Sequence, residues 1–349
     1  MDYLPLIENV RNRISKWTVR ALSFAGRLQL VRSVIFSVTN FWIADFRLPK
    51  ACIQEIDKLC SAFLWSGPSL NPRKAKVAWK DVCLPKEEGG LGLRSIEEAN
   101  KVCCLKLIWK LISSKNSLWV NWVTEYLIRR GSFWAVQRST NSGSWMWRKL
   151  LKYRDLAKQF YMVEVKGGNN TSFWFDHWSD LGCLFDRVGD RGPIQLGINR
   201  LATVGEVLDR HRRRRHRQTI YTDIEYEILK IRQQREEGVD DVVKWKSHSG
   251  QWQPKFVSRD TWDHIRIVRP KVNWYRGVWF SQATPKYSFM ATVYSIWRER
   301  NNRKHGEKAL TVFRMVRMID KLVKNQICSI RNNGVRKYED GLEIWFASR

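Results

Sequence analysis

Two pairs of neighbouring residues in this chain have side chains of the types that catalysis often uses. Asp240 and Asp241 are adjacent, and paired carboxylates can hold the divalent cations of nucleotidyl transfer. Asp176 precedes His177, and these residue types take part in general acid–base chemistry. No third carboxylate accompanies the first pair, and no nucleophile or second metal ligand accompanies the second. We therefore expect both pairs to be structural and predict no catalytic residue.

The cysteines do not have the spacing of a metal site or of a disulfide framework. No Cys-x-x-Cys occurs, and adjacent Cys103 and Cys104 are too close in sequence to chelate zinc. Their odd number and mostly apolar helical surroundings are typical of reduced thiols in an intracellular protein. We predict no metal, no cofactor and no small-molecule substrate. The seven cysteines are Cys52, Cys60, Cys83, Cys103, Cys104, Cys183 and Cys328.

The charge balance is the most informative bulk property. The chain has 62 Lys and Arg against 34 Asp and Glu, a net charge of +28. Such an excess favours polyanions, RNA or DNA above all, through phosphate contacts that read no base. A merely solvated basic surface is the alternative. The candidate binding residues are Arg73, Lys74, Lys76, Arg212, Arg213, Arg214, Arg215, Arg314, Arg317, Lys321 and Lys324.

These candidates fall into three groups. The first, residues 73–76, lies in a predicted loop and could grip the phosphates of a duplex. The second belongs to residues 210–217, R-H-R-R-R-R-H-R, which repel one another and are predicted to be exposed as an import signal, a phosphate clamp or a helix flank. The third is a basic stripe along a predicted helix at 310–330. The import interpretation slightly favours the nucleus, and no apolar run is long enough to predict a membrane span.

The elements that must position these residues are mainly helices. Apolar residues recur with the helical period over 4–19, 24–42 and 53–64, and Ser23 is a predicted N-cap. Residues 79–94 contain Pro85 and three glycines and are predicted to form a loop. Ser95 with Glu98 then forms a predicted capping box for a mostly buried helix over 96–112. The tryptophans that follow are predicted to anchor helix packing rather than to stack on bases: Trp119, Trp122, Trp134, Trp145 and Trp147.

The second half of the sequence adds short strands. Residues 161–165 and 171–175 flank Lys-Gly-Gly-Asn-Asn and predict a hairpin, and 242–246 with 251–257 predict another. Helices are predicted over 221–235 and from Ser258. The last predicted helix has one apolar face, formed by Val312, Val316, Ile319, Val323, Ile327 and Ile330. The fold class is therefore α+β, mainly α: a helical bundle, short hairpins and a terminal helical segment.

One long, ordered stretch resembles a known family. Trp-x-x-Val-Cys-x-Pro-Lys, Gly-Gly-Leu-Gly-Leu-Arg and Asn100 with Lys-Leu-Ile-Trp-Lys occur in order within 79–112. They closely resemble the segment that follows the reverse transcriptase core in plant non-LTR (LINE-type) retrotransposon polyproteins. Residues 22–27 and Phe-Leu-Trp-x-Gly at 63–67 look like the helical thumb of these elements. Residues 168–178 are similar to their linker, and 245–258 look like the entry to their terminal zinc-binding module.

The resemblance also implies what this sequence lacks. The family's catalytic carboxylates lie upstream of the thumb, and the chain begins too late to include them, so we expect no polymerase activity. Val278-Trp279 and the residues 285–289 resemble the opening of the zinc module. The following sequence runs directly into a region that resembles what lies beyond the module's cysteines. Zinc is thus expected for the intact family module, but its ligands are missing here.

We therefore predict three regions and a non-catalytic function. The regions are a thumb- and connection-like bundle at 1–150, a linker with hairpins and the arginine block at 151–257, and a shortened zinc-module-like region at 258–349. The leading hypothesis is a retrotransposon remnant, related to reverse transcriptase, that at most binds RNA or DNA without sequence preference. One alternative is a fragment of an active RNA-directed DNA polymerase whose palm lies upstream. Another is a protein-interaction or assembly module, and the oligomeric state is left open.

Overall fold

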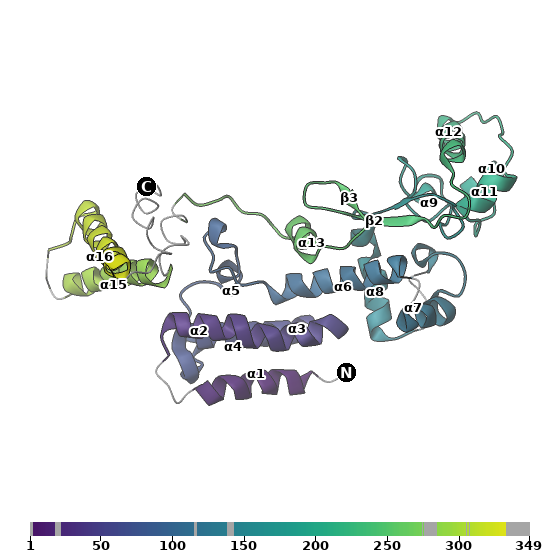
Figure 1. The fold of residues 1–349 in the computed structure, drawn as a ribbon. Helices are drawn as coiled ribbons and strands as arrows, with labels where there is room; N and C mark the ends of the chain where they lie inside the picture. Colours follow the sequence, from purple (N-terminus) through teal and green to yellow (C-terminus); the bar gives the residue numbers. More distant parts are fainter. Residues whose placement is uncertain are drawn as a thin grey trace. The chain divides into compact units, whose positions relative to one another are not determined.

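The computed structural model describes residues 3–17, 22–114, 117–137, 143–273, 275, 285–304, 306 and 308–332 (Figure 1). Two compact units are present. Unit 1 comprises Met1–Val38, Ala51–Ser95 and Val268–Arg349, and unit 2 comprises Thr39–Lys50 and Ile96–Ile267. The described residues are mainly helical and contain one three-stranded antiparallel sheet, which confirms the α+β, mainly α class. The division of the sequence into the regions 1–150, 151–257 and 258–349 remains a prediction.

The N-terminal helices follow the predicted apolar period. Helix α1 spans Leu4–Lys16 and buries Leu6, Val10 and Ile14, whereas Thr18 and Val19 of the predicted helix lie outside the described residues. Ser23 caps α2 (Phe24–Leu30), because its hydroxyl accepts a hydrogen bond from the Gly26 amide at 3.2 Å. A π-helical turn at Val31–Ile35 leads into α3 (Phe36–Asp45). The Ser23 cap is thus confirmed.

Most of α3, from Thr39 on, belongs to unit 2, and unit 1 resumes at Ala51 with α4 and the glycine-rich loop. Helix α4 (Lys50–Ser66) stops at Gly67, whose φ is +66°, and only glycine adopts this angle without cost. The loop contains α5 (Trp79–Val82) and a 3-10 turn at Lys86–Glu88, so no long helix runs through it. At Gly90 a Cβ atom would lie 2.1 Å from the carbonyl oxygen of Leu84, which explains the glycine. The predicted loop is confirmed.

The C-terminal part of unit 1 begins with a short segment that pairs with this loop. The Val272 amide donates to the Glu87 carbonyl at 2.9 Å, and Lys271 pairs with the Glu87 carboxylate at 2.8 Å. Helices α15 (Pro285–Lys304) and α16 (Val312–Asn332) follow. Val278-Trp279, the predicted opening of the zinc module, lies outside the described residues, as do the side chains of residues 285–289.

Unit 2 contains the larger continuous core and the sheet. The core is formed by apolar residues of most of its elements, including Trp134, Trp147, Trp174 and Trp245. The predicted helix at 96–112 is confirmed as α6 (Ile96–Ser113). The other helices are α7 (Leu118–Val123), with a π-helical turn at Thr124–Ile128, α8 (Trp145–Lys158), α9 (Leu184–Val188), α10 (Arg191–Leu196), α11 (Val204–Arg210), α12 (Thr219–Gln234) and α13 (Ser258–Ile265).

The sheet corrects one predicted hairpin and confirms the other. Strand β1 (Tyr161–Glu164) pairs with β2 (Val242–Lys246), with Tyr161 opposite Trp245, and β2 pairs with β3 (Trp252–Gln253). The predicted pairing of 161–165 with 171–175 is therefore wrong. Residues 171–175 form turns instead, because Phe173 and Trp174 both enter the core and the Asp176 carboxylate binds the Ser172 amide. The aromatic run indicated burial rather than a strand.

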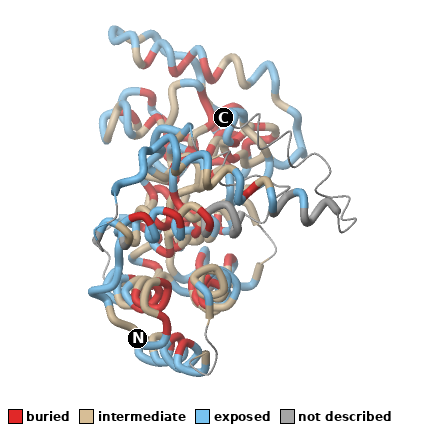
Figure 2. Tube along the Cα trace, turned by 90° about the vertical axis from the view of Figure 1, so that its left-hand side faces the viewer, coloured by how far each residue is buried: buried red, intermediate tan, exposed pale blue. Residues whose placement is uncertain are grey.

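The tryptophans of 119–147 are mostly packing residues, as predicted. Trp134 and Trp147 are buried and Trp119 and Trp145 half-buried, but Trp122 is 50% exposed. Buried positions alternate with exposed ones along the helices (Figure 2). In α16, Val323 is buried, whereas Val312 and Val316 are exposed, and the side chains of Ile327 and Ile330 lie outside the described set. The predicted apolar face of α16 is thus only partly buried.

Candidate nucleic-acid interface

The first predicted basic group lies on an exposed loop of unit 1. Arg73 and Lys74 belong to a 3-10 turn at Pro72–Lys74, and Lys76 follows it. Asn71 caps this turn by accepting a hydrogen bond from the Arg73 amide at 3.0 Å. All three basic side chains are exposed. Their exposure leaves all three accessible to phosphate groups.

The third predicted group lies along α16, also in unit 1. Arg314, Arg317 and Lys321 are exposed, and the Arg317 guanidinium lies over the Phe313 ring at 4.4 Å from its centroid. Lys324 is half-buried and pairs with Asp320 at 3.0 Å. The charge of Lys324 is therefore partly engaged within the helix.

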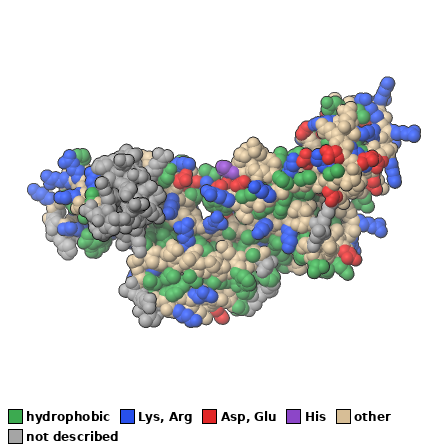
Figure 3. Space-filling model, viewed as in Figure 1, with side chains coloured by type: hydrophobic (Ala, Val, Ile, Leu, Met, Phe, Trp, Pro, Cys, Tyr) green, Lys and Arg blue, Asp and Glu red, His purple; other side chains and the backbone are tan. Residues whose placement is uncertain are grey.

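The second predicted group, the arginine block at 210–217, lies between α11 and α12 of unit 2. As predicted, Arg212, Arg213, Arg214 and Arg215 are exposed. Lys and Arg side chains project at the upper right of Figure 3, where Figure 1 shows α10–α12. The predicted sites are thus distributed over both units, two groups in unit 1 and one in unit 2.

A buried carboxylate fixes the backbone of the arginine block. The Glu225 side chain on α12 is only 2% exposed, and its Oε1 atom lies 3.0 Å from His211 Nε2 and 3.2 Å from His216 Nε2. The same oxygen accepts a hydrogen bond from the Arg214 amide at 3.1 Å. Burial alone would raise the pKa of Glu225, but these hydrogen bonds outweigh burial and hold the pKa below its usual value. The three contacts, called the Glu225 clamp here, hold the arginines on an ordered loop.

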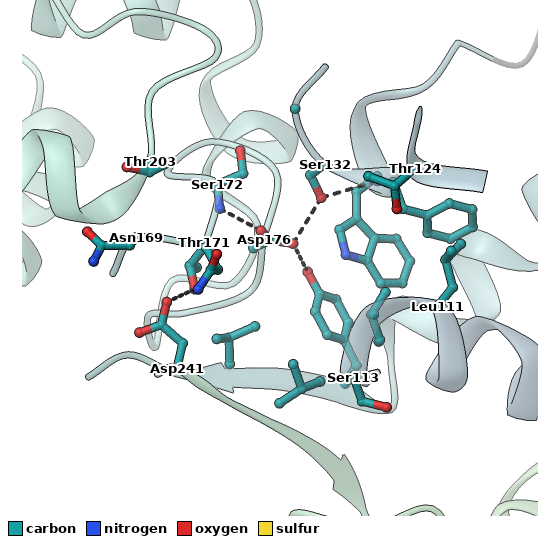
Figure 4. A pocket seen from close by; sticks show the side chains of 18 of the residues that line it. Leu111, Ser113, Thr124, Ser132, Asn169, Thr171, Ser172, Asp176, Thr203 and Asp241 are labelled. Atoms are coloured by element: carbon teal, nitrogen blue, oxygen red, sulfur yellow. Dashed lines mark hydrogen bonds between the residues drawn. The ribbon is translucent and has the colours of Figure 1, made fainter. Parts of the chain in front are cut away.

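Asp176 lies in a different part of unit 2, where it lines a cavity of about 660 Å³ (Figure 4). The buried Asp176 carboxylate accepts hydrogen bonds from Ser132 Oγ at 3.1 Å, the Tyr161 hydroxyl at 3.2 Å and the Ser172 amide at 2.6 Å. Burial raises the pKa of Asp176 to about 6, although these hydrogen bonds act in the opposite direction. The carboxylate fastens three segments of the unit together.

His177 is not part of a catalytic triad with Ser132 and Asp176. Its Nδ1 atom lies 3.0 Å from the carbonyl oxygen of Tyr161, and its ring packs edge-on against Tyr161 and Trp252. Ser132 donates directly to Asp176, so no imidazole lies between them to accept the hydroxyl proton. His177 is thus held by its own fold, in agreement with the structural role expected for the Asp176–His177 pair.

Asp240 and Asp241 also line this cavity, and their carboxylates bind their own fold. Asp241 Oδ1 accepts hydrogen bonds from the amides of Lys166 and Gly168, both at 2.8 Å. Its Oδ2 accepts one from Thr171 Oγ1 at 2.6 Å, which Figure 4 shows as a dashed line. Asp240 accepts a longer bond from Asn170 Nδ2 at 3.2 Å. Asp241 thus anchors the 166–171 loop, to which Asp240 adds one longer bond.

Most of the cysteine thiols are buried or half-buried. All seven cysteines are free, and burial raises the pKa of Cys52 to about 11 and of Cys104 to about 12, which keeps these thiols protonated. Cys328 is exposed, whereas the sequence predicts apolar surroundings for most of the cysteines. Within the described ranges, no three His, Cys, Asp or Glu side chains come together to hold a metal ion. None of the described helices is long and apolar enough to cross a bilayer.

Comparison with known proteins gives two relatives, both from Arabidopsis thaliana. Over 179 residues, 50% of the chain, it is 33% identical to "Putative ribonuclease H protein At1g65750", of which the match covers 28%. Over 134 residues, 38% of the chain, it is 25% identical to "Uncharacterized mitochondrial protein AtMg00310", of which the match covers 86%. No family model and no solved structure matches the chain.

These relatives suggest a retroelement-related protein. The match covers half of this chain and only 28% of the length of the first relative. The comparison therefore supports the retroelement theme of the sequence motifs and not a particular activity.

Sequence reasoning missed Arg187 and Arg191, and it left Arg217 of the arginine block out of the candidate binding residues. Arg187 of α9, Arg191 of α10 and Arg217 line a second cavity in unit 2 together with Arg215. Arg187 and Arg191 stand next to Asp186 and Asp190 in the sequence, so no local charge run marked them. Only the packing of α9 and α10 beside the arginine block shows the cluster.

Proposed function

We propose that this chain is a non-catalytic, reverse-transcriptase-related protein of retroelement origin that binds RNA or DNA without sequence preference. The resemblance of residues 22–112 to the segment after the reverse transcriptase core supports the polymerase ancestry. The two plant relatives support only the broader retroelement theme. Descent from a LINE-type element, a terminal zinc-module remnant without ligands and a nuclear location belong to the same proposal.

The engaged carboxylates of unit 2 support the proposed absence of catalysis. A nucleotidyl transferase needs carboxylate oxygens that are free to hold two cations. The oxygens of Asp241 and Asp176 instead accept hydrogen bonds from amides and hydroxyls of their own fold. A metal at either position would have to compete with these bonds.

The exposed arginine block, whose backbone is held by the Glu225 clamp, is the main support for the proposed nucleic-acid binding. Arginine binds phosphate oxygens through a planar array of donors, and the contact is favourable when the donor is already ordered. The clamp orders the backbone at Arg214, while the four arginine side chains stay accessible to a ligand. Phosphate contacts of this kind do not read base sequence.

Two assays test the proposal. In gel-shift titrations with RNA and DNA oligonucleotides of equal length and unrelated sequence, the affinities should agree within about threefold, since phosphate contacts carry no sequence information. In primer extension with Mg²⁺ or Mn²⁺, the chain should incorporate no nucleotide. Incorporation that is lost on Asp240→Ala and Asp241→Ala substitution would contradict the proposal and establish the enzyme alternative.

A second candidate function, self-assembly, is favoured by one exposed aromatic patch in unit 2. Trp122 and Tyr126 stack with ring centroids 5.7 Å apart, and Leu118 beside them in sequence is exposed. Exposed apolar patches often mark protein contacts. Sedimentation over a range of concentrations should show association that Trp122→Ala with Tyr126→Ala removes; a constant monomer mass would rule this function out.

A further inference from the structure

A cavity lined by four arginines adjoins the Glu225 clamp in unit 2. It has a volume of about 550 Å³, and its lining includes Arg187 and Arg191 from α9 and α10 and Arg215 and Arg217 from the arginine block. None of the described residues that line it carries a carboxylate. Its inner wall includes the buried Tyr221, whose ring lies 5.5 Å from the ring of His216. A concave, strongly cationic site is therefore built from elements far apart in the sequence.

The acidic residues near these arginines in the sequence are engaged elsewhere. Asp186 pairs with Lys158 at 2.6 Å, and Asp190 pairs with Arg200. Glu225 binds the two histidines of its clamp. Within the part of the chain that the structure describes, Arg191, Arg215 and Arg217 form no ion pair with a carboxylate. A bound anion would offset the repulsion among these positive charges.

The arginines of the block do not all serve this cavity. The guanidinium of Arg214 lies against Gly197 at the end of α10, where a Cβ atom would be 2.6 Å from Arg214 Nη2. Arg212 and Arg213 are exposed but do not line the cavity. The structure thus divides one run of like charges into residues that face a defined site and residues that do not.

The site is also ordered before any ligand arrives. The Glu225 clamp holds the loop at His211, Arg214 and His216, directly beside the arginines that line the cavity. On the other side, Arg187 Nε donates to the Leu181 carbonyl at 3.2 Å, which fixes that guanidinium. The loop backbone and the Arg187 guanidinium are thus ordered in advance, which lowers the entropy cost of binding.

We infer that this cavity is a phosphate-binding pocket, which takes adjacent phosphate groups through Arg187, Arg191, Arg215 and Arg217. Guanidinium groups match the spacing of phosphate oxygens and bind them in pairs. The volume exceeds that of one phosphate ion several times, so the pocket suits a chain of phosphates. The phosphates come from a nucleic-acid backbone, in which case the inference rests on the proposed function, or from a free polyphosphate.

Two double variants of equal charge test the pocket in the full chain. Arg215→Ala with Arg217→Ala removes two lining arginines, and Arg148→Ala with Lys152→Ala removes two exposed cations of α8 in the same unit that neither line the cavity nor belong to a predicted basic group. The probes are a labelled single-stranded DNA 12-mer, followed by fluorescence anisotropy, and inorganic tripolyphosphate, followed by calorimetry. Circular dichroism confirms that both variants are folded.

The pocket predicts unequal losses. The lining variant should bind the 12-mer at least tenfold more weakly, and the slope of log affinity against log salt should flatten by about 1.4, the value for two lost contacts to a single strand. The control variant should lose less than about threefold. Arg191→Ala, which removes a lining arginine of α10, should weaken binding in the wild-type background and add little to the lining variant, because the three arginines share one ligand.

The outcomes separate this inference from the proposed function. Equal losses in the two double variants, with salt-sensitive DNA binding by the wild type, would overturn the pocket and leave the proposed function standing. Tripolyphosphate binding that only the lining variant loses, without any DNA binding, would support the pocket with a free polyphosphate as its ligand and overturn the proposed function. Binding of neither probe by the wild type would overturn both.

Discussion

Replacing Asp241 should destabilise unit 2, whereas replacing its neighbour Asp240 should not. The Asp241 carboxylate accepts the amides of Lys166 and Gly168 and the hydroxyl of Thr171, so it holds the 166–171 loop to the start of β2. Asp240 is exposed, and its hydrogen bond to Asn170 is longer, at 3.2 Å. The two carboxylates are adjacent and equally charged, which makes Asp240→Ala a matched control for Asp241→Ala.

The expected magnitude follows from the three bonds at Asp241. A hydrogen bond to a charged group contributes about 1.5–3 kcal/mol, but the contributions are not additive and Asp241 is only half-buried. Asp241→Ala should therefore cost about 2–4 kcal/mol. Asp241→Asn should cost less than about 1.5 kcal/mol, because its carbonyl oxygen still accepts both amides and its NH2 group can donate to Thr171. Asp240→Ala should stay within about 1 kcal/mol.

Urea denaturation followed by tryptophan fluorescence measures these differences, and hydrogen exchange locates them. The amides of Lys166 and Gly168 should lose protection in Asp241→Ala and keep it in Asp240→Ala. If both alanine variants are as stable as the wild type and retain this protection, the carboxylate does not anchor the loop. The structural interpretation of Asp240–Asp241 would then fail.

Three further predictions concern buried groups of unit 2. Because the pKa of Asp176 rises to about 6 on folding, the folded state binds the proton more tightly, and the contribution of this group to stability falls as pH rises from about 4 to about 6, by on the order of 3 kcal/mol. Asp176→Asn should thus be less destabilising at pH 7 than at pH 4 in urea titrations, and an equal cost at both would refute the shift. Arg154→Met should cost about 2–4 kcal/mol in the same assay, because Arg154 Nη1 donates to the carbonyls of Phe133, Trp134 and Val136 and their bonds would be lost; a change below about 1 kcal/mol would contradict this role. Glu225→Ala should speed hydrogen exchange over 211–217 while leaving β1 protected, and unchanged exchange there would show that the clamp does not order the loop.

Local signals predicted the helices and their ends well. Ser23 caps α2, and the helix predicted over 96–112 is α6, because capping and the apolar period depend on residues within a few positions of one another. The exposure of the arginine block also followed from its own charge. Each of these features is decided by short-range chemistry that a single sequence contains.

Long-range pairing could not be predicted in the same way. The partner of β1 is β2, some 80 residues later, and not the nearby aromatic run around Phe173. The role of Asp241 depends on a loop 70 or more residues earlier in the chain. The arginine pocket likewise combines Arg187 and Arg191 with Arg215 and Arg217 across the packing of α9, α10 and the arginine block. None of these contacts leaves a pattern in either segment alone.

The salt dependence of nucleic-acid binding by the full chain tests the central claim most directly. The logarithm of the affinity for a duplex of arbitrary sequence should fall linearly with the logarithm of the salt concentration, with a slope of about −0.9 for each phosphate contact. Four contacts would lower the affinity by roughly a hundredfold between 50 and 200 mM salt, by the same relation. Affinity that does not change over this range, or no binding at the lowest salt, would contradict the account.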